Sequence, residues 1–275
     1  SRYTGFMELR QIGVVRSAIK TRKEMPTLGS PAAIELLPGF EAGLLRFEKH
    51  SHIWVLAWLD QAERDILQVT PRGVTDQGPE GLHGVFAVRS PARPNPIGLT
   101  ACRVRNVEGR LIRVDRLDFI DGTPVLDLKP YFVTKDAIFS AVNSRIGLPA
   151  TREALQESLL MQACNFHGEQ CADLALGVRI VEDYRVRFHD MGEPERWRIA
   201  APASRLCMVD ALMGMTRTSL GRGMLKLHDT DSVKFFLEDG SAEYAISLEV
   251  PGDPQLVLRA PEQVLWELWT SSTTS

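Results

Sequence analysis

The chain has 275 residues, of which 44% are hydrophobic and 24% charged, as in soluble globular proteins with one large or two modest domains. No apolar run reaches the roughly 18 residues that a membrane helix needs, and no signal-peptide core opens the sequence. We therefore expect a cytoplasmic protein without a membrane partner. The four cysteines form no CxxC pair and are too few for a disulfide scaffold.

The net charge of −3 is unevenly divided between the two halves of the chain. Residues 1–145 carry 20 Lys/Arg against 16 Asp/Glu, a balance of +4, whereas residues 146–275 carry 12 against 19, a balance of −7. Only the first half therefore has the charge to attract a polyanion such as RNA.

The first half predicts short strands. Residues 7–17 mix apolar and polar side chains, and the apolar run at 53–59 has the length and aromatic content of a buried strand. A turn at residues 108–110 predicts a hairpin between its flanking runs. Further strands are expected at 84–89, 99–107, 111–117 and 124–129. About six short strands without a strong amphipathic helix between them predict a barrel or a sandwich.

The second half follows a break near residues 143–151, where Gly147 and Pro149 interrupt the pattern. Its mixed helical and strand patterns predict an α+β domain. Helices are expected from Thr151, at 174–187 and at 204–215, with Ser204 as an N-cap. Next come a hairpin from the runs 235–238 and 243–250, a closing helix at 261–269 and a frayed tail at 270–275.

The most unusual segment is R-S-P-A-R-P-N-P-I-G-L-T at residues 89–100. Its three prolines fix the backbone and predict a stiff loop that holds Arg89, Arg93 and Asn95 in place. A guanidinium can hold a carboxylate or phosphate with two hydrogen bonds, so this loop suits an anionic ligand. A rigid surface loop with solvated arginines is the alternative.

Two more segments contain candidate ligand contacts. In D-G-T-P-V-L-D-L-K-P-Y, residues 121–131, strand alternation predicts that Val125, Asp127 and Lys129 share one face. An acid and a base at a strand end either mark a ligand site or form an ordinary surface pair. His52, at the entrance of the apolar strand, is either a ligand contact or a half-buried structural histidine.

The segments at residues 89–100 and 121–131 together resemble the signature pair of the TsaA/TrmO family of S-adenosylmethionine-dependent methyltransferases. The supporting stretches I-G-V-V-R-S, F-E-K-H-S-H-I-W-V-L and G-V-F-A-V-R-S are also present. The resemblance implies a small antiparallel β-barrel over residues 7–142 that binds S-adenosylmethionine. It also implies a homodimer with the cofactor near the subunit interface. The chain accordingly lacks a G-x-G-x-x-G dinucleotide motif after a strand.

The activity implied by the resemblance is N6-methylation of threonylcarbamoyl-adenosine, the base next to the anticodon of certain tRNAs. The cofactor would supply the methyl group and the protein the positioning, so no general base is required. Asn95 and Tyr131 are our candidates for orienting the base. Family members often have P-R-Q in the first loop, where this chain has P-T-L. The cofactor contacts carried over from the family are Pro26, Thr27, Leu28, His52, Ile53, Arg89, Leu99, Asp127, Leu128, Lys129 and Pro130.

The second half resembles the FmdE-like domain through F-H-G-E-Q-C-A-D-L-A-L-G and C-M-V-D-A-L-M-G-M-T-R-T-S-L-G-R-G. We therefore expect an FmdE-like α+β accessory domain over residues 151–270. His167 and Cys171, four residues apart on one expected helical turn, could share a metal with Cys207. Glu169 and Thr218 replace a histidine and a cysteine of the family, so we expect a scaffold and not a metal enzyme.

Three functions remain open. The leading one is a tRNA methyltransferase; the others are an S-adenosylmethionine- or metal-binding adaptor with a protein partner, and a methyltransferase acting on a small molecule. A tRNA partner requires a continuous basic face on the barrel. The residues available for such a face are Arg16, Lys20, Arg22, Lys23, Arg93, Arg103 and Arg105.

Overall fold

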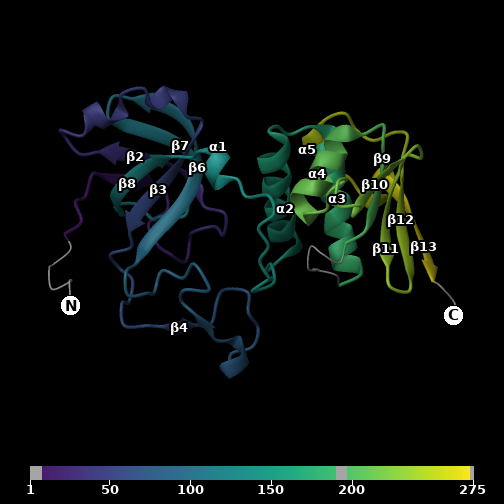
Figure 1. Ribbon diagram of the computed structural model, residues 1–275, viewed down its shortest axis with the longest axis horizontal. Helices are drawn as coiled ribbons and strands as arrows, with labels where there is room; N and C mark the ends of the chain where they lie inside the picture. Colours follow the sequence, from purple (N-terminus) through teal and green to yellow (C-terminus); the bar gives the residue numbers. More distant parts are fainter. Residues whose placement is uncertain (1–7, 190–196, 273–275) are drawn as a thin grey trace. The chain divides into compact units, whose positions relative to one another are not determined.

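The computed structural model describes residues 8–189 and 197–272, which form two compact units (Figure 1). The division between the units falls after Ile138. It therefore lies just before the break that Gly147 and Pro149 predict.

Six strands close the first unit into an antiparallel barrel in the order β1-β2-β7-β6-β3-β8. This confirms the barrel that the resemblance implied. The strands are β1 (Gly13–Ser17), β2 (Ser30–Leu36), β3 (His52–Trp58), β6 (Ile97–Glu108), β7 (Leu111–Leu117) and β8 (Pro124–Pro130).

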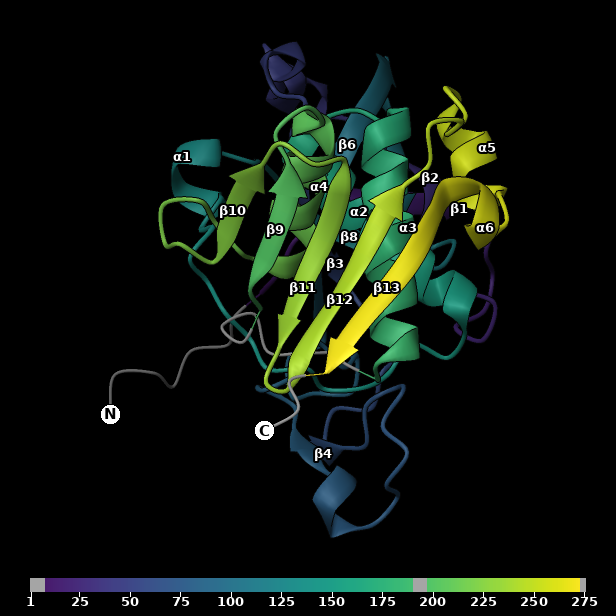
Figure 2. The same ribbon diagram turned by 90° about the vertical axis from the view of Figure 1, so that its right-hand side faces the viewer.

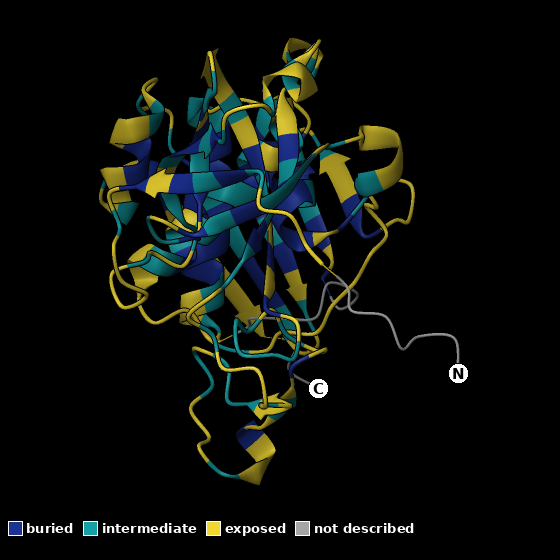
Figure 3. Ribbon diagram, turned by 90° about the vertical axis from the view of Figure 1, so that its left-hand side faces the viewer, coloured by how far each residue is buried: buried dark blue, intermediate teal, exposed yellow. Residues whose placement is uncertain are grey.

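The apolar alternation of β3 explains its central place in the barrel. Ile53, Val55 and Ala57 are fully buried and point into the core, while the side chains between them lie on the outer face. In Figure 3 the buried residues lie mainly on the strands and helices, whereas the loops are mostly exposed or intermediate. The side chains on the outer surface of β3 are therefore available for function.

One expectation for the first half was wrong, and one strand was not predicted. Residues 84–89 do not form a strand, because only β5 (His83–Gly84) pairs, with β4 (Gln68–Val69), in the long connection between β3 and β6. The strand that was not predicted is β2. Its short S-P-A-A-I-E-L run has weak alternation and is ordered by pairing with β1 and β7. The remaining short elements are η1 (Glu41–Leu44), η2 (Phe47–Lys49), η3 (Pro79–Gly81) and α1 (Val133–Asp136).

The second unit is a five-stranded sheet in the order β10-β9-β11-β12-β13 with helices packed on one face (Figure 2). Among the described strands of this unit, β9 and β10 alone pair in parallel, so the expected α+β class is confirmed. The strands are β9 (Ile199–Pro202), β10 (Leu225–His228), β11 (Ser232–Leu237), β12 (Gly240–Ile246) and β13 (Trp266–Ser272). The helices are α2 (Arg152–His167), α3 (Ala172–Arg187), α4 (Leu206–Thr216), α5 (Pro254–Arg259) and α6 (Glu262–Leu265).

The beginnings of the first two helices follow from local sequence. The Thr151 side chain caps α2 by accepting from the Ala154 backbone N–H, as its residue type predicts. The Cys171 sulfur accepts in the same way at the start of α3. The end of α2 at His167 and the start of α3 at Cys171 therefore fix the positions of these two residues.

Two other expectations were wrong in this unit. Ser204 does not cap α4, which begins after Arg205 without a side-chain cap. The closing helix stops after one turn, α6, because residues 266–272 add an edge strand to β12 by main-chain hydrogen bonds. The tail is therefore paired as far as Ser272, and residues 273–275 lie outside the described part. Among the helices of residues 8–189 and 197–272, none has the length and apolar character to cross a membrane.

Candidate functional site

Three neighbouring strands of the barrel, β6, β3 and β8, bring several of the predicted site residues onto one outer face. In the strand register, Leu56 of β3 lies between Leu99 of β6 and Asp127 of β8. One pair further along, Trp54 lies opposite Lys129. Leucine and tryptophan side chains therefore border the two charged groups.

A β-bulge in β8 changes the predicted alternation of this strand. The register against β3 shifts at Ala57, so Asp127 pairs with Leu56 while Val125 pairs with Ala57. Val125 is buried and Leu128 packs against the same core, which places these two residues inside the barrel. The expectation that Val125 shares a face with Asp127 was therefore wrong, because the extra residue of a bulge inverts the side chains that follow.

The charged pair itself is close and accessible. Lys129 Nζ lies 2.7 Å from Asp127 Oδ2, and the two side chains are 61% and 44% exposed. Asp127 Oδ1 also accepts from the Leu128 backbone N–H at 2.9 Å. An exposed ion pair contributes little to stability. The Asp127 carboxylate and the Lys129 ammonium do, however, complement the ammonium and carboxylate groups of a zwitterionic amino acid.

An aromatic group occupies the end of this face where β8 finishes. The Tyr131 ring lies 5.5 Å from Trp54 and 6.5 Å from His52, measured between ring centroids. Asp136 Oδ2 accepts from Trp54 Nε1 at 3.1 Å and from the Phe132 backbone N–H at 2.8 Å. Asp136 therefore holds the segment after β8 against the indole.

His52 lies in a basic environment beside this aromatic group. Partial burial lowers the pKa of His52, and the positive charges of nearby arginines lower it further against the opposing effect of Asp115. These arginines are Arg103, directly opposite on β6, together with Arg105 and Arg116. Three cations therefore gather at this end of the face.

Three predicted contacts can reach a ligand from this face only through their backbone or a ring edge. Ile53 is fully buried, and Leu128 packs against the core, so neither side chain is available outside the barrel. Pro130 is half-buried and pairs with Ile53 at the end of β8. The apolar outer walls are instead Leu56 and Leu99.

The proline-rich loop is braced from within. Arg93 donates to the backbone carbonyls of Ser90 at 2.7 Å and Val85 at 2.6 Å, and also to that of Val88. Two guanidinium nitrogens of Arg93, Nε and Nη2, therefore fix the loop, and only Nη1 is left for an anionic ligand. Arg89 and Asn95 are exposed at the start and near the end of the same loop.

The first loop forms a turn, in which the Gly29 N–H donates to the Pro26 carbonyl at 3.0 Å. Gly29 has φ +81 and lies against Leu117, where a Cβ would approach the backbone to 2.7 Å. Thr27 is exposed and Leu28 half-buried within the turn. The turn precedes β2 and therefore lies at the barrel end where β7 finishes.

Asn95 and Tyr131 lie at opposite ends of the face. Ile97, just after Asn95, pairs with Trp58, while Pro130, just before Tyr131, pairs with Ile53. The five intervening steps along β3 amount to about 17 Å at ~3.3 Å per residue. One barrel therefore does not bring these two side chains to the same atom.

The basic residues predicted to form a continuous face are divided among different roles. Arg16 pairs with Glu35 at 2.7 Å and Lys20 with Asp121 at 2.7 Å. Arg93 braces its own loop, whereas Arg22 and Lys23 are exposed in the first loop. Only Arg103 and Arg105 join the group around His52.

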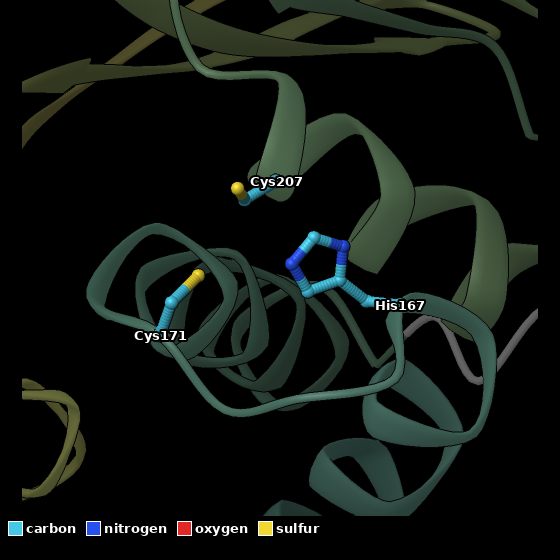
Figure 4. A group of neighbouring side chains, drawn as sticks. All are labelled: His167, Cys171 and Cys207. Atoms are coloured by element: carbon cyan, nitrogen blue, oxygen red, sulfur yellow. The ribbon is translucent and has the colours of Figure 1, made fainter.

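A second cluster lies in the α+β unit. His167, Cys171 and Cys207 place their ligand atoms within 4.8 Å of one another (Figure 4). His167 ends α2, Cys171 caps α3 and Cys207 lies in the first turn of α4. The expectation that the first two share a helical turn was wrong, because Gly168 ends α2 between them, yet the fold still brings them together.

The histidine of this cluster is oriented by a carboxylate. Its Nδ1 lies 2.9 Å from Asp210 Oδ2, and its buried Nε2 has no hydrogen-bond partner in the described part of the chain. Burial raises the pKa of Cys207, and the neighbouring Cys171 thiol raises it further. Figure 4 shows the imidazole and both sulfurs directed toward a common space. An imidazole nitrogen without a partner, facing two thiols, suits a metal ion.

The two family substitutions lie outside this cluster. Glu169 is exposed on the turn after α2. Thr218 is buried, and its hydroxyl bonds to that of Thr216 at 2.8 Å. Their replacement therefore leaves the three candidate ligands in place.

Comparison with known proteins identifies the family of the barrel. Residues 14–137 match the tRNA-methyltransferase O N-terminal domain. A probable S-adenosyl-L-methionine-binding protein of Methanothermobacter thermautotrophicus is 42% identical over 137 residues, which cover 48% of this chain and 95% of that protein. The chain belongs to the tRNA-methyltransferase O (TrmO) family. Residues 166–264 match FmdE of the molybdenum formylmethanofuran dehydrogenase operon, so an FmdE-like domain follows the TrmO-family barrel.

A longer similarity includes part of both units. A probable S-adenosyl-L-methionine-binding protein of Archaeoglobus fulgidus is 38% identical over 229 residues, which are 80% of this chain. The chain spans 60% of the length of that relative. A crystal structure of TrmO from Pseudomonas aeruginosa is 22% identical, with a TM-score of 0.44, and covers 88% of this chain and 93% of that one.

Several residues on the outer face of β6, β3 and β8 were not predicted from the sequence. Trp54 and Leu56 were detectable, because strand alternation from His52 places them on the same side. Asp136 and Arg116 come from other segments and reach the face only through tertiary structure. Asp210 was hidden for the same reason, since its partner His167 lies on another helix.

Proposed function

We propose that the barrel binds S-adenosylmethionine on the outer face of β6, β3 and β8 and methylates N6 of threonylcarbamoyl-adenosine in tRNA. Membership of the TrmO family supports this activity, as do relatives named as S-adenosylmethionine-binding proteins. The observation that carries the proposal is the Asp127–Lys129 pair beside the apolar walls of that face.

The residues of this face fit the chemical groups of the cofactor. Asp127 would accept from its ammonium group and Lys129 would donate to its carboxylate, each replacing the mutual ion pair. Leu56 and Leu99 offer apolar contact to the adenosine. When bound, the sulfonium supplies the methyl group; the protein positions the acceptor amine in line with it.

The remaining contacts lie at the far end of the barrel and require a second copy. Arg89, Asn95 and the Pro26–Leu28 turn are near one end of β3, whereas His52 and Tyr131 are at the other, about 17 Å away at ~3.3 Å per residue. In our proposal a homodimer places Asn95 of one protomer toward Tyr131 of its partner. Both side chains then orient the modified base through neutral hydrogen bonds.

The tRNA itself would contact the cations at the end of the face. Arg103, Arg105 and Arg116 lie around His52, next to the Trp54 and Tyr131 rings. Guanidinium groups beside aromatic rings combine phosphate contact with base stacking. This group is smaller than the continuous basic face expected for a tRNA partner, so the proposed RNA contact rests on these three arginines and the neighbouring rings.

Mass spectrometry of tRNA nucleosides tests the activity. A strain without the gene should lose N6-methyl-threonylcarbamoyl-adenosine, and the wild-type gene should restore it. Asp127→Asn should fail to restore it, whereas Glu35→Gln, which removes an exposed carboxylate elsewhere on the barrel, should succeed. An unchanged nucleoside profile in the deletion strain, with cofactor binding retained, would leave the adaptor alternative.

We propose a second function for the α+β unit, which is to hold a transition-metal ion such as Zn²⁺. His167 Nε2 and the sulfurs of Cys171 and Cys207 would be the ligands, and Asp210 fixes the imidazole. Ligands at about 2.0–2.3 Å from one zinc ion need only small side-chain rotations from the present separations. Three ligands leave the fourth position open, where a bound ion would act as a Lewis acid.

Elemental analysis of protein purified without chelator tests the metal site. We expect about one zinc per chain in wild type and loss of the metal in His167→Ala and Cys171→Ser. Cys164→Ser is the matched control, because Cys164 is not part of the three-residue cluster. Metal-free wild-type protein would restore the scaffold interpretation.

A further inference from the structure

A cavity of about 290 Å³ in the second unit has no role in either proposed site. It lies where the last turns of α2 and α4 meet the residues that follow α4. Its principal lining residues are Phe139, Phe166, Met213, Arg217, Thr218 and Arg222. We propose that this cavity binds a small planar anion of the size of a mononucleotide.

The apolar side of the cavity suits a flat ring. The rings of Phe139 and Phe166 lie 5.8 Å apart at an interplanar angle of 75°, an edge-to-face pair. Phe139 is nevertheless 61% exposed, so one side of its ring is free for a further contact. Met213 adds a thioether, which packs well against aromatic groups. An aromatic ligand would bury apolar surface that is exposed without it.

The polar side of the cavity is cationic in a unit that is otherwise acidic. Arg222 is held in place, because its Nε donates to Ser219 Oγ at 3.2 Å and its Nη2 donates to the Arg217 carbonyl. Arg217 caps α4 in the left-handed conformation with φ 59. In residues 8–189 and 197–272, neither guanidinium is paired with a carboxylate. Two adjacent unpaired arginines therefore indicate an anionic partner.

The helix ends do not cancel this positive charge. The carboxyl ends of α2 and α4 each contribute roughly −0.5 of an elementary charge at the cavity, against two full positive charges on the arginines. Other arginines of the unit are neutralised: Arg187 pairs with Asp183, and Arg205 with Asp173 and Asp231. The charged side chains that line this cavity are thus both positive.

The volume limits the ligand. Ligand pockets commonly measure about 300–1,000 Å³, so a cavity at the lower bound accommodates one ring system with its charged group. The ring would contact Phe139, and the phosphate or carboxylate would take hydrogen bonds from Arg217 and Arg222. The nucleotide could be free or part of an RNA chain, and the two sources share this chemistry.

Calorimetry on the full chain, with the barrel saturated by S-adenosylhomocysteine, separates this cavity from any adenine site on the barrel. We expect AMP to bind at least tenfold more tightly than adenosine or inorganic phosphate. Arg217→Ala and Phe139→Ala should each raise the Kd for AMP at least tenfold. Arg259→Ala, which removes an exposed arginine of α5 outside the cavity, should leave it unchanged.

A parallel titration with unmodified tRNA distinguishes the two sources. Binding of AMP that is lost in the cavity variants assigns a free nucleotide. If the wild-type protein does not bind AMP and Arg217→Ala binds tRNA more weakly than wild type, the ligand of the cavity is a nucleotide of the RNA. If AMP and tRNA both bind to Arg217→Ala and Phe139→Ala as they do to wild type, or if neither ligand binds the wild-type protein, the proposal is overturned.

Discussion

Gly98, in the signature segment, is expected to tolerate no side chain. A Cβ built at this position would lie 2.4 Å from Phe119 Cε1 and 3.2 Å from Leu59 Cδ2. The Phe119 ring is 3% exposed and packed in the barrel core, so it cannot move into solvent. Gly98→Ala should therefore destabilise the protein by about 1–3 kcal/mol, the usual cost of overpacking a core.

Urea unfolding followed by circular dichroism measures this cost. Gly84→Ala is the matched control, because no atom lies within 4 Å of a Cβ at that position. Phe119→Leu combined with Gly98→Ala should recover part of the loss, since the two side chains compete for one space. Equal midpoints for Gly98→Ala and Gly84→Ala would refute the packing explanation of this glycine.

Three more predictions follow from single residues. Asp127→Asn should weaken S-adenosylmethionine binding by about 1.5–3 kcal/mol in calorimetry, with Glu35→Gln as control; equal affinities would remove Asp127 from the site. Because burial lowers the pKa of His52 from 6.5, the unfolded chain binds more protons and stability falls as pH drops through and below 6.5. Urea midpoints of His52→Gln should lose that pH dependence, and parallel curves would contradict the assignment. Arg179→Met removes hydrogen bonds to the carbonyls of Val257, Leu258 and Ala260 and leaves the buried Glu182 without this partner. We therefore expect the free energy of unfolding to fall by about 3–5 kcal/mol relative to the control Arg259→Met. Similar unfolding midpoints for the two variants would show that Arg179 is dispensable.

The strands with clear local patterns were predictable from the sequence. β3 and the β6–β7 hairpin have apolar alternation and a turn, and both formed as expected. β2 was not predictable, because its short run gains order only from neighbours distant in sequence. The short length of α6 was not predictable for the same reason, because the residues that follow it pair with β12 despite their helical spacing.

The candidate site was predictable in composition more than in geometry. The family motifs identified Asp127 and Lys129, but a bulge decides which neighbours share their face. The signature loop was expected to offer two arginines, and one of them turned inward to hold its own backbone. Side-chain hydrogen bonds to distant carbonyls leave no local pattern, so sequence reasoning could not separate Arg93 from Arg89.

The central claim, that the barrel is a cofactor site, is tested most directly by titrating the full chain with S-adenosylmethionine in a calorimeter. We expect saturable binding with about one cofactor per protomer, and an affinity that falls roughly 10–150-fold in Asp127→Asn, the equivalent of 1.5–3 kcal/mol. No heat and no thermal stabilisation at millimolar cofactor, with the protein folded, would contradict the claim.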